Sequence, residues 1–482
     1  MMATPIDSSI SISFLFSAFL FLLVCSLNKG YASSAESTLE NHFHTVQINS
    51  LLPASVCSPS TKDHSKGASL KVVHKHGPCS HLSKEKANAA TATQILTRDK
   101  TRVNSIQSRL NFNLVQKNTL KNTKASIPAK SGSSIGSGNY IVTIGLGTPK
   151  KDLSLIFDTG SDFTWTQCQP CARYCYSQQD PTFDPSLSKT YKNISCNSAQ
   201  CSALGSATSA SPGCATTTCV YGIQYGDSSY SVGFFGSETL TLTPSDIFPN
   251  FLFGCGQNNR GLFGASAGLI GLGRDSLSIV SQTASKYGKF FSYCLPSRSS
   301  SDGYLAFGKA GTSGALQFTP LSSNSQNPSF YFIDITGIKV GGTTLSISQS
   351  VFKTAGAIID SGTVITRLPP AAYTPLRTAF RQQMKQYPMA QALSILDTCY
   401  DLSKYSTVSI PKISFLFGGN IEVPLAANGI LYAGSASQVC LAFAGNSAAS
   451  DVGIFGNVQQ QTLNVVYDVA GGKLGFASGG CS

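Results

Sequence analysis

Two short acidic motifs contain the residues whose types and spacing could do chemistry. The first, Leu155 to Phe163, reads L-I-F-D-T-G-S-D-F and places Asp158 at the end of an apolar run. The second, Ala357 to Thr366, reads A-I-I-D-S-G-T-V-I-T and repeats this arrangement around Asp360, 202 residues later. One such motif would carry little weight, because Asp, Ser, Thr and Gly are the usual residues of tight turns. Two copies, each behind an apolar run, predict two similar lobes that each contribute one carboxylate to a shared site.

A pair of buried carboxylates is suited to acid–base catalysis. Two carboxyl groups about 3 Å apart cannot both ionise comfortably, so they share a proton. One group can then act as a base on a water molecule while the other donates a proton to the carbonyl group under attack. The alternative interpretation is that the motifs are two unrelated turns that happen to contain aspartate.

The positions of the histidines exclude several other mechanisms. The chain has six histidines, and none of them follows His81. Nucleophilic catalysis by Ser-His or Cys-His pairs, and zinc sites built on histidine, need an imidazole that the region of the two motifs lacks. We therefore expect carboxylate chemistry without a cofactor or a metal. A metal site at His74, His76 and His81, ahead of that region, is the alternative for the histidine cluster.

Composition indicates the elements that must position the two aspartates. Only 12% of the 482 residues are charged and 44 are glycine, which favours an all-β chain of two or three domains with many turns. Residues 140–147 alternate as a strand does, and residues 220–233 alternate around a Gly-Asp-Ser turn as a β-hairpin does. Helices are predicted in few places: 95–114, 275–284 and 370–385.

The cysteines predict disulfides. Twelve of the fifteen cysteines lie from Cys168 onward, and seven of these fall within residues 168–219. An even number in a chain with an export signal predicts about six disulfides. Metal binding by Cys168, Cys171 and Cys175 is the alternative.

The N-terminal region resembles an export signal followed by a basic segment. Residues 12–27 are apolar and small, and more small residues follow up to Ala35, as in a secretory signal peptide; an uncleaved anchor is the alternative. Residues 29–125 contain 14 Lys/Arg against 5 Asp/Glu, a charge of +9, whereas residues 126–482 carry only +4. Any nucleic-acid role would therefore belong to the basic segment, and we expect neither a nucleic-acid partner nor a stable membrane anchor.

The two motifs resemble those of pepsin-family aspartic proteases, and the cysteine-rich residues 168–219 resemble the insertion of the plant nepenthesin-like branch. The resemblance implies an all-β, bilobal pepsin-like fold, with two similar β-barrel-like lobes and an active-site cleft between them. It divides the chain into a signal peptide (1–34), a prosegment (35–125), an N-terminal lobe (126–325) and a C-terminal lobe (326–482). Maturation is expected between residues 121 and 138.

The resemblance also implies roles for individual residues. Each lobe of the family closes with an apolar pair and a glycine beside the aspartate loop, which here would be 269–271 and 454–456. Ser361 stands where animal relatives often have Thr, so a hydroxyl is retained. The implied site consists of catalytic Asp158 and Asp360, the orienting hydroxyls of Ser161 and Thr363, the indole of Trp165, the flap tyrosine Tyr225, and a disulfide between Cys399 and Cys440.

The expected function is a secreted aspartic endopeptidase, made as a zymogen and acting as a monomer on proteins or peptides at acidic pH outside the cell, in the apoplast. The vacuole and the chloroplast are alternative locations. A catalytically inactive relative that acts as a binding or inhibitor protein, like the plant xylanase-inhibitor proteins, is one alternative function. A DNA-associated chloroplast aspartic protease is another. Asn193 begins a sequon, Asn193-Ile194-Ser195, and is the expected glycosylation site.

Overall fold

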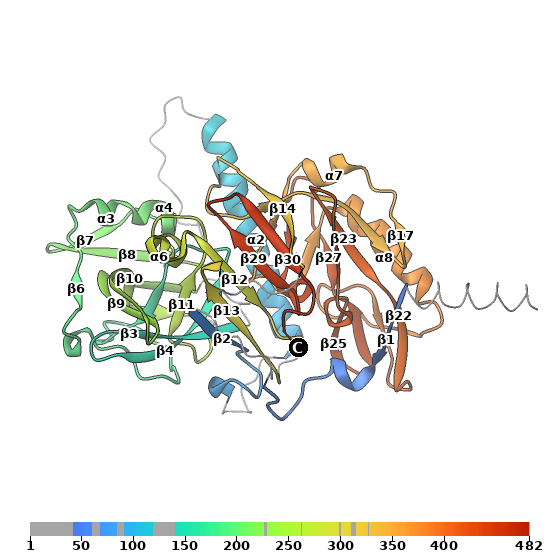
Figure 1. Cartoon of the computed structure of the whole chain (residues 1–482), viewed down its shortest axis with the longest axis horizontal. Coiled ribbons are helices and arrows are strands. Elements are labelled where there is room, and N and C mark those ends of the chain that lie inside the picture. The colour runs from blue at the N-terminus through green and yellow to red at the C-terminus, as the bar shows by residue number, and fades with distance from the viewer. Residues whose placement is uncertain are drawn as a thin grey trace, which may run out of the picture.

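The computed structural model describes residues 42–59, 68–83, 91–118, 140–225, 229–261, 263–297, 300–309, 315–325 and 327–481. The predicted signal peptide and the predicted maturation region lie outside these ranges. Two lobes built mainly of β-strands lie side by side, and helix α2 (Ala92–Asn118) runs between them (Figure 1). The predicted all-β, bilobal fold is confirmed. No helix among the described residues is long and apolar enough to cross a membrane.

The N-terminal lobe, teal to yellow in Figure 1, contains the first aspartate motif and the long β9–β10 hairpin. Buried and half-buried side chains alternate along most of β9, which is the period of a strand with one face on the core. Its strands are β3 (Tyr140–Leu146), β4 (Lys151–Asp158), β5 (Trp165–Gln167), β6 (Lys192–Asn193), β7 (Gly213–Ala215), β8 (Thr218–Gln224), β9 (Tyr230–Thr243), β10 (Asp246–Arg260), β11 (Gly268–Gly271), β12 (Phe290–Cys294) and β13 (Asp302–Phe307).

The C-terminal lobe, orange to red in Figure 1, contains the second motif and two four-stranded sheets, β17-β16-β23-β24 and β20-β21-β26-β25. Its strands are β14 (Gln317–Ser322), β15 (Phe332–Ile333), β16 (Ile335–Val340), β17 (Thr343–Thr344), β18 (Ala357–Ile359), β19 (Thr366–Leu368), β20 (Met389–Ala390), β21 (Cys399–Tyr400), β22 (Thr407–Pro411), β23 (Ile413–Phe417), β24 (Ile421–Pro424), β25 (Leu431–Ser435), β26 (Gln438–Leu441), β27 (Phe443–Gly445), β28 (Gly453–Phe455), β29 (Asn464–Asp468) and β30 (Lys473–Ala477).

The same strand arrangement surrounds each aspartate. In the N-terminal lobe β11 runs parallel to β4 and pairs Gly271 with Asp158. In the C-terminal lobe β28 runs parallel to β18 and pairs Phe455 with Ile359, the residue before Asp360. The apolar residues of β4 and β18 are buried, as a strand covered on both faces requires. The repeated closing segments that the sequence indicated therefore lie beside the two aspartate loops.

The basic segment ahead of the first motif is integrated into both lobes. Strand β1 (Phe43–Gln47) pairs with β22 of the C-terminal lobe. Strand β2 (Ala68–His74) lies between β13 and β3 and bonds to both. Through β2, an uninterrupted series of paired strands connects β3 with β13, β12, β29, β30 and β14.

The helices of the body are few and short. Helix α8 (Pro370–Gln383) begins with proline at its first position, where the missing N–H removes no helical bond. The helix predicted over 275–284 is wrong in its bounds, because Thr283 separates α5 (Ile279–Gln282) from α6 (Ala284–Tyr287). The others are α3 (Ala199–Ser202), α4 (Leu204–Thr208), α7 (Gln349–Lys353) and α9 (Asn457–Gln460).

Candidate active site

Asp158 and Asp360 meet between the lobes, each at the end of a buried strand. Both side chains are at most 1% exposed. The backbone N–H of Gly160 donates to Asp158 Oδ1 at 2.9 Å, and that of Gly362 donates to Asp360 Oδ1 at 3.0 Å. A Cβ on Gly160 would lie 2.7 Å from Asp360 Oδ1, and one on Gly362 would lie 2.4 Å from Asp158 Oδ1. Glycine at both positions therefore allows the two loops to approach each other.

A reciprocal pair of hydrogen bonds joins the two loops. The backbone N–H of Thr159 donates to Ser361 Oγ at 3.1 Å, and the backbone N–H of Ser361 donates to Thr159 Oγ1 at 2.9 Å. All four groups are buried, so each bond satisfies a donor that water does not reach. The hydroxyl of Ser361 is thus used as a link between lobes.

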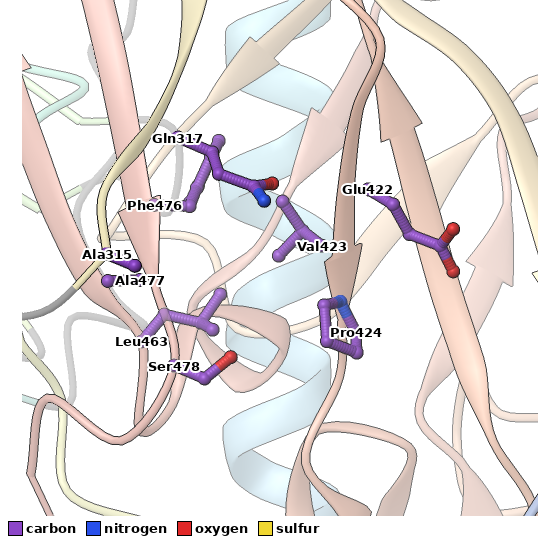
Figure 2. Close-up of a pocket in the computed structure, with 9 residues that line it drawn as sticks. All are labelled: Ala315, Gln317, Glu422, Val423, Pro424, Leu463, Phe476, Ala477 and Ser478. Atoms are coloured by element: carbon purple, nitrogen blue, oxygen red, sulfur yellow. The ribbon is translucent and has the colours of Figure 1, made fainter. Parts of the chain in front are cut away.

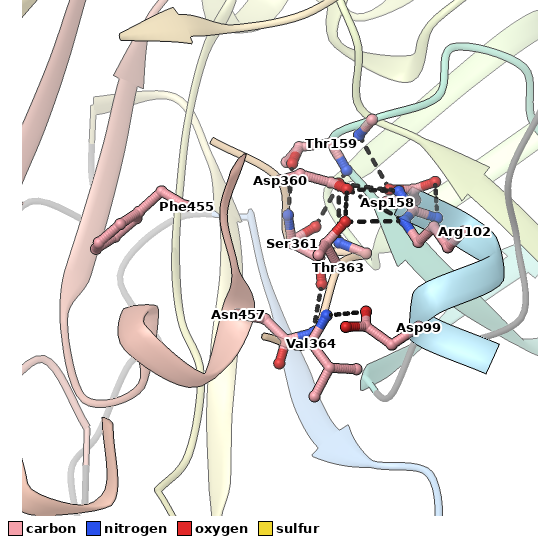
Figure 3. A network of polar contacts seen from close by, with 12 residues as sticks. Asp99, Arg102, Asp158, Thr159, Asp360, Ser361, Thr363, Val364, Phe455 and Asn457 are labelled. Atoms are coloured by element: carbon pink, nitrogen blue, oxygen red, sulfur yellow. Dashed lines mark hydrogen bonds and ion pairs between the residues drawn. The ribbon is translucent and has the colours of Figure 1, made fainter. Parts of the chain in front are cut away.

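Arg102 of helix α2 occupies the space between the two carboxylates (Figure 3). Its Nη2 lies 2.8 Å from Asp158 Oδ1 and 2.9 Å from Asp360 Oδ2. Its Nε lies 3.1 Å from Asp360 Oδ2 and 3.3 Å from Thr363 Oγ1. The guanidinium is 1% exposed, so these bonds form in a site from which water is excluded.

Burial and Arg102 act in opposite directions on the two carboxyl groups. Burial raises the pKa of Asp158, and the charge of Arg102 only partly opposes this effect. Burial would also raise the pKa of Asp360, but the charge of Arg102 and the hydrogen bond from Thr363 together lower it. Burial would lower the pKa of Arg102, yet the two aspartates raise it above its ordinary value. The two carboxyl groups are therefore inequivalent, with Asp360 the more readily ionised.

The two predicted orienting hydroxyls behave differently. Thr363 Oγ1 donates to Asp360 Oδ2 at 2.5 Å, in line with an orienting role. Ser161 Oγ is buried, and it has no hydrogen-bond partner among the described residues. Its expected bond to Asp158 is absent there, and the Gly160 N–H and Arg102 hold that carboxylate instead.

Trp165 and Tyr225 lie together under the hairpin of β8 and β9. The indole N–H of Trp165 donates to the hydroxyl of Tyr225 at 2.7 Å, and both side chains are buried. Phe263 packs edge-on against both rings, with centroid distances of 4.9 Å to Trp165 and 5.7 Å to Tyr225. The tip of the predicted flap, residues 226–228, lies outside the described residues.

Helix α2 contacts the C-terminal lobe at two further polar points. Asp99 accepts hydrogen bonds from the backbone N–H groups of Val364 and Ile365 at 2.6 and 3.2 Å, as Figure 3 shows for Val364. Gln107 bonds Val452 reciprocally, donating to its carbonyl at 2.7 Å and accepting from its N–H at 2.8 Å. Apolar residues of the same helix pack among buried side chains of the C-terminal lobe: Leu96, Val103, Ile106 and Leu110.

A pocket of about 390 Å³ lies away from the aspartates, between β14, β24 and β30 of the C-terminal lobe (Figure 2). Its charged lining residue, Glu422, is paired with Lys339 at 2.5 Å. The rest of the lining is mainly apolar and small. Helix α2 places Arg102 at the aspartates, and none of the residues that line this pocket belongs to either aspartate motif.

The cysteines of the described residues form disulfides. The alternative of a metal site at Cys168, Cys171 and Cys175 is wrong, because Cys168 is bonded to Cys255 and Cys171 to Cys175. The other disulfides are Cys57–Cys79, Cys196–Cys214, Cys201–Cys219, Cys294–Cys481 and Cys399–Cys440. The Cys399–Cys440 bond links β21 to β26.

The histidine cluster and the sequon lie apart from the aspartates. His81 Nε2 lies 2.9 Å from Asp180, while His74 packs edge-on against Tyr140. Within the described ranges, no group of three or more His, Cys, Asp or Glu side chains is placed to hold a metal ion. Asn193 is exposed on β6, where a glycan could be attached.

Sequence reasoning did not identify Arg102, Asp99 or Thr159 individually. Arg102 and Asp99 lie three residues apart on one face of a predicted helix, which was the available signal. Thr159 follows Asp158 as Ser361 follows Asp360, so comparing the two motifs position by position could have paired them.

Comparison with known proteins gives consistent matches over both lobes. The family model described as Xylanase inhibitor N-terminal matches residues 140–309, and that described as Xylanase inhibitor C-terminal matches residues 330–478. The crystal structure of basic 7S globulin from soybean has a TM-score of 0.56 at 22% identity, covering 70% of this chain and 91% of that one. At this identity the likeness shows the fold alone.

Relatives of higher identity carry protease names. An aspartyl protease family protein of Arabidopsis thaliana is 55% identical over 465 residues, which are 96% of this chain and 98% of the relative. The Arabidopsis aspartyl protease AED1 is 50% identical over 96% of this chain and 98% of its own length. Aspartic proteinase nepenthesin-2 of Nepenthes gracilis is 40% identical over 72% of this chain and 78% of its own. The chain therefore belongs to the plant pepsin-like aspartic protease family, which includes nepenthesin-like enzymes.

Proposed function

We propose that this chain is the zymogen of a secreted aspartic endopeptidase that hydrolyses peptide bonds at acidic pH. One observation supports the proposal above the others: a cation from the N-terminal segment, Arg102, is bound to both aspartates of the site. A substrate cannot reach these carboxylates while α2 is in place. In this proposal, residues 35–125 are the prosegment, and the lobes span 126–325 and 326–482.

In the mature enzyme, a water molecule takes the place of Arg102 Nη2, because that position is within hydrogen-bond distance of both carboxylates. The ionised carboxylate accepts a proton from this water as its oxygen attacks the peptide carbonyl, and the protonated partner donates to the carbonyl oxygen. Collapse of the tetrahedral intermediate breaks the C–N bond as the carboxyl group that took the proton from water passes it to the leaving amine. No covalent bond to the enzyme forms.

The remaining site residues have supporting roles in this proposal. Thr363 holds Asp360 in position and lowers its pKa, which favours Asp360 as the ionised member of the pair. Trp165 fixes Tyr225 through the bond to its hydroxyl, so that the hairpin can close over the substrate and exclude water. Asn193 carries the glycan of the secreted form.

An inactive binding or inhibitor protein is the second candidate, favoured by the xylanase-inhibitor description of both matching family models. Both aspartates are present, and reciprocal hydrogen bonds between Thr159 and Ser361 hold their two loops together. This arrangement argues for catalysis. A DNA-associated chloroplast protease is disfavoured, because paired cysteines suit the oxidising secretory route.

The test uses the purified full-length chain. It is held at pH 7 or brought to about pH 4, then given a denatured protein with or without pepstatin. We expect pepstatin-sensitive cleavage only after acidification. Asp158→Asn and Asp360→Asn should each lower turnover at least ~10³-fold, since neither carboxylate can replace the other.

Two controls make this test decisive. Asp152→Asn alters an exposed carboxylate on the same strand as Asp158 and should leave turnover unchanged. A trace of wild-type enzyme, with its own activity subtracted, processes the variant chains so that failed maturation is not mistaken for failed catalysis. Binding of polypeptide without cleavage at any pH would instead support the inactive relative.

A further inference from the structure

We propose that Arg367 makes the mature enzyme prefer substrates with an acidic side chain close to the scissile bond. This inference rests on the endopeptidase function proposed above and adds a substrate class to it. Arg367 lies on β19 (Thr366–Leu368), seven residues beyond Asp360. In this structure Arg367 binds the carboxylate of Asp99, which lies on the prosegment helix α2.

Donor groups of the C-terminal lobe surround the carboxylate of Asp99. Arg367 Nη2 donates to Asp99 Oδ2 at 2.8 Å. The backbone N–H of Val364 donates to Oδ1 at 2.6 Å, and that of Ile365 donates to Oδ2 at 3.2 Å. Charge-assisted bonds of this kind are the strong ones in proteins, and here each carboxylate oxygen receives at least one donor. The body of the protein therefore provides a binding position for a carboxylate.

This position is buried where helix α2 docks against the C-terminal lobe. Asp99 is 0% exposed and the Arg367 side chain 5% exposed. Arg367 Nη1 also donates to the carbonyl of Ile365 at 2.7 Å, a bond within the body that keeps the guanidinium in place when the helix leaves. Arginine does not lose its proton in proteins. Removal of the prosegment thus leaves a fixed positive charge without the carboxylate that neutralises it.

The position lies near the reacting bond. Asp99 precedes Arg102 by three residues, which corresponds to about 4.5 Å along a helix axis. Arg102 itself marks the place of the scissile bond, since it contacts both aspartates. An extended peptide advances about 3.3 Å per residue. An acidic side chain one or two residues from the scissile bond could therefore take the place of Asp99.

The test compares matched peptides with the acid-matured full-length protein. A peptide that the enzyme cuts at one bond is synthesised with either Asn or Asp at each of the two positions on either side of that bond. Assays are run at about pH 5, where an Asp side chain with a pKa near 3.9 is mostly ionised. The measured quantity is the Asp/Asn ratio of kcat/KM at each position, which does not depend on the amount of active enzyme.

For the wild type we expect a ratio of at least about 10 at one position, because the neutral peptide leaves the buried guanidinium unpaired. Arg367→Gln should bring the ratio to about 1, and Arg367→Glu should bring it below 1. Arg377→Gln, which removes a guanidinium paired with Asp397 elsewhere in the lobe, should keep the wild-type ratio.

The outcomes separate this inference from the function on which it rests. A wild-type ratio near 1 at every position, with all peptides cleaved, would overturn the role of Arg367 while leaving the endopeptidase intact; the Asp99–Arg367 pair would then serve only to hold the prosegment. An unchanged high ratio in Arg367→Gln would assign the preference to another residue. Cleavage of no peptide at all would instead contradict the proposed endopeptidase.

Discussion

Arg102 binds Asp158 through two hydrogen bonds, from Nη2 to Oδ1 at 2.8 Å and from Nη1 to Oδ2 at 3.3 Å. The guanidinium lowers the pKa of Asp158 and of Asp360 relative to a cleft that lacks it. These carboxyl groups therefore carry fewer protons when the prosegment is docked than when the cleft is open. By linkage, docking is favoured at neutral pH and weakens as the pH falls.

Replacing Arg102 with Gln should make maturation easier. The change removes the ion pairs with both aspartates and leaves a shorter, uncharged polar side chain with the same first three side-chain carbons. We expect Arg102→Gln to convert to the shorter form at a midpoint about one pH unit higher than the wild type. Conversion is measured by electrophoresis after incubation across pH 3 to 7. Lys100→Gln, an exposed charge on the same helix, is the control, and equal midpoints for both variants would contradict the role of Arg102.

The histidines of the prosegment add a second response to acid. Burial and the charge of Lys75 lower the pKa of His74 to about 4. Burial, Lys75 and Arg98 lower the pKa of His76 to about 2. The ring nitrogens His74 Nδ1 and His76 Nε2 are shielded from water and have no partner among the described residues. Both histidines are thus neutral when the prosegment is docked. Their contribution to docking is full above about pH 6.5 and is lost as the pH falls toward their lowered pKa values.

His74→Phe should therefore lower the pH at which the prosegment is released. Phenylalanine keeps the edge-on ring contact with Tyr140 but cannot take up a proton. The expected result is a conversion midpoint below that of the wild type, measured as for Arg102→Gln. His42→Phe, which changes an exposed histidine, should leave the midpoint unchanged. A midpoint that His74→Phe does not move would show that this histidine does not contribute to release.

The contrast between Asp158 and Arg102 shows how far the sequence alone could lead. The position of Asp158 is a local property: an apolar run predicts a buried strand, and a turn motif ends it. Arg102 is one of 14 basic residues between 29 and 125, and its three-residue spacing from Asp99 on a predicted helix does not by itself place it between the two aspartates. Its role depends on where α2 lies in the cleft. Ser161 shows the same limit, since the motif contains the hydroxyl but does not fix the direction in which it points.

Asp162 gives a prediction about stability. Burial raises the pKa of this carboxyl group to about 7, although the backbone N–H of Asp275 donates to it at 2.8 Å. Between about pH 4 and 7 the folded protein therefore keeps a proton that the unfolded chain has lost. This contribution to stability is full below about pH 4 and is lost as the pH rises through 7.

Asp162→Asn is neutral at every pH, so it should stabilise the protein more at pH 8 than at pH 4, by up to about 4 kcal/mol. Denaturant unfolding at the two pH values measures the difference. All proteins carry Asp360→Asn, so that the chain does not cut itself during the measurement. Asp152→Asn, at an exposed position, should show no such pH dependence. An Asp162→Asn effect of equal size at both pH values would contradict the raised pKa.

Tyr225 and Trp165 test the flap. Tyr225→Phe keeps the ring contact with Phe263 but leaves the buried indole N–H without its acceptor, at a cost of about 1–3 kcal/mol. We expect kcat/KM on peptides to fall at least ~10-fold while the circular dichroism spectrum stays unchanged. Phe248→Leu, which alters an aromatic contact with Tyr287, is the control. Normal peptide kinetics in Tyr225→Phe would leave the Trp165 bond a purely structural feature.

The bonds between Thr159 and Ser361 should couple the two lobes. Ser361→Ala removes the acceptor of the Thr159 N–H, and Thr159→Ala removes the acceptor of the Ser361 N–H. Each change leaves one buried donor unpaired and should lower the free energy of unfolding by about 1–3 kcal/mol. Ser361→Thr retains the hydroxyl, so it should lose less than either alanine variant.

The pair is best measured in a double-mutant cycle, again in the Asp360→Asn background. The two bonds share one pair of loops and hold them in register, so loss of the first should loosen the second. The double variant should then lose less stability than the two single variants together, with a coupling of at least about 0.5 kcal/mol. Strict additivity would show that the bonds act independently. In a catalytically intact chain, Ser361→Ala should also lower kcat more than it raises KM, because displacement of Asp360 relative to Asp158 affects the transition state more than peptide binding.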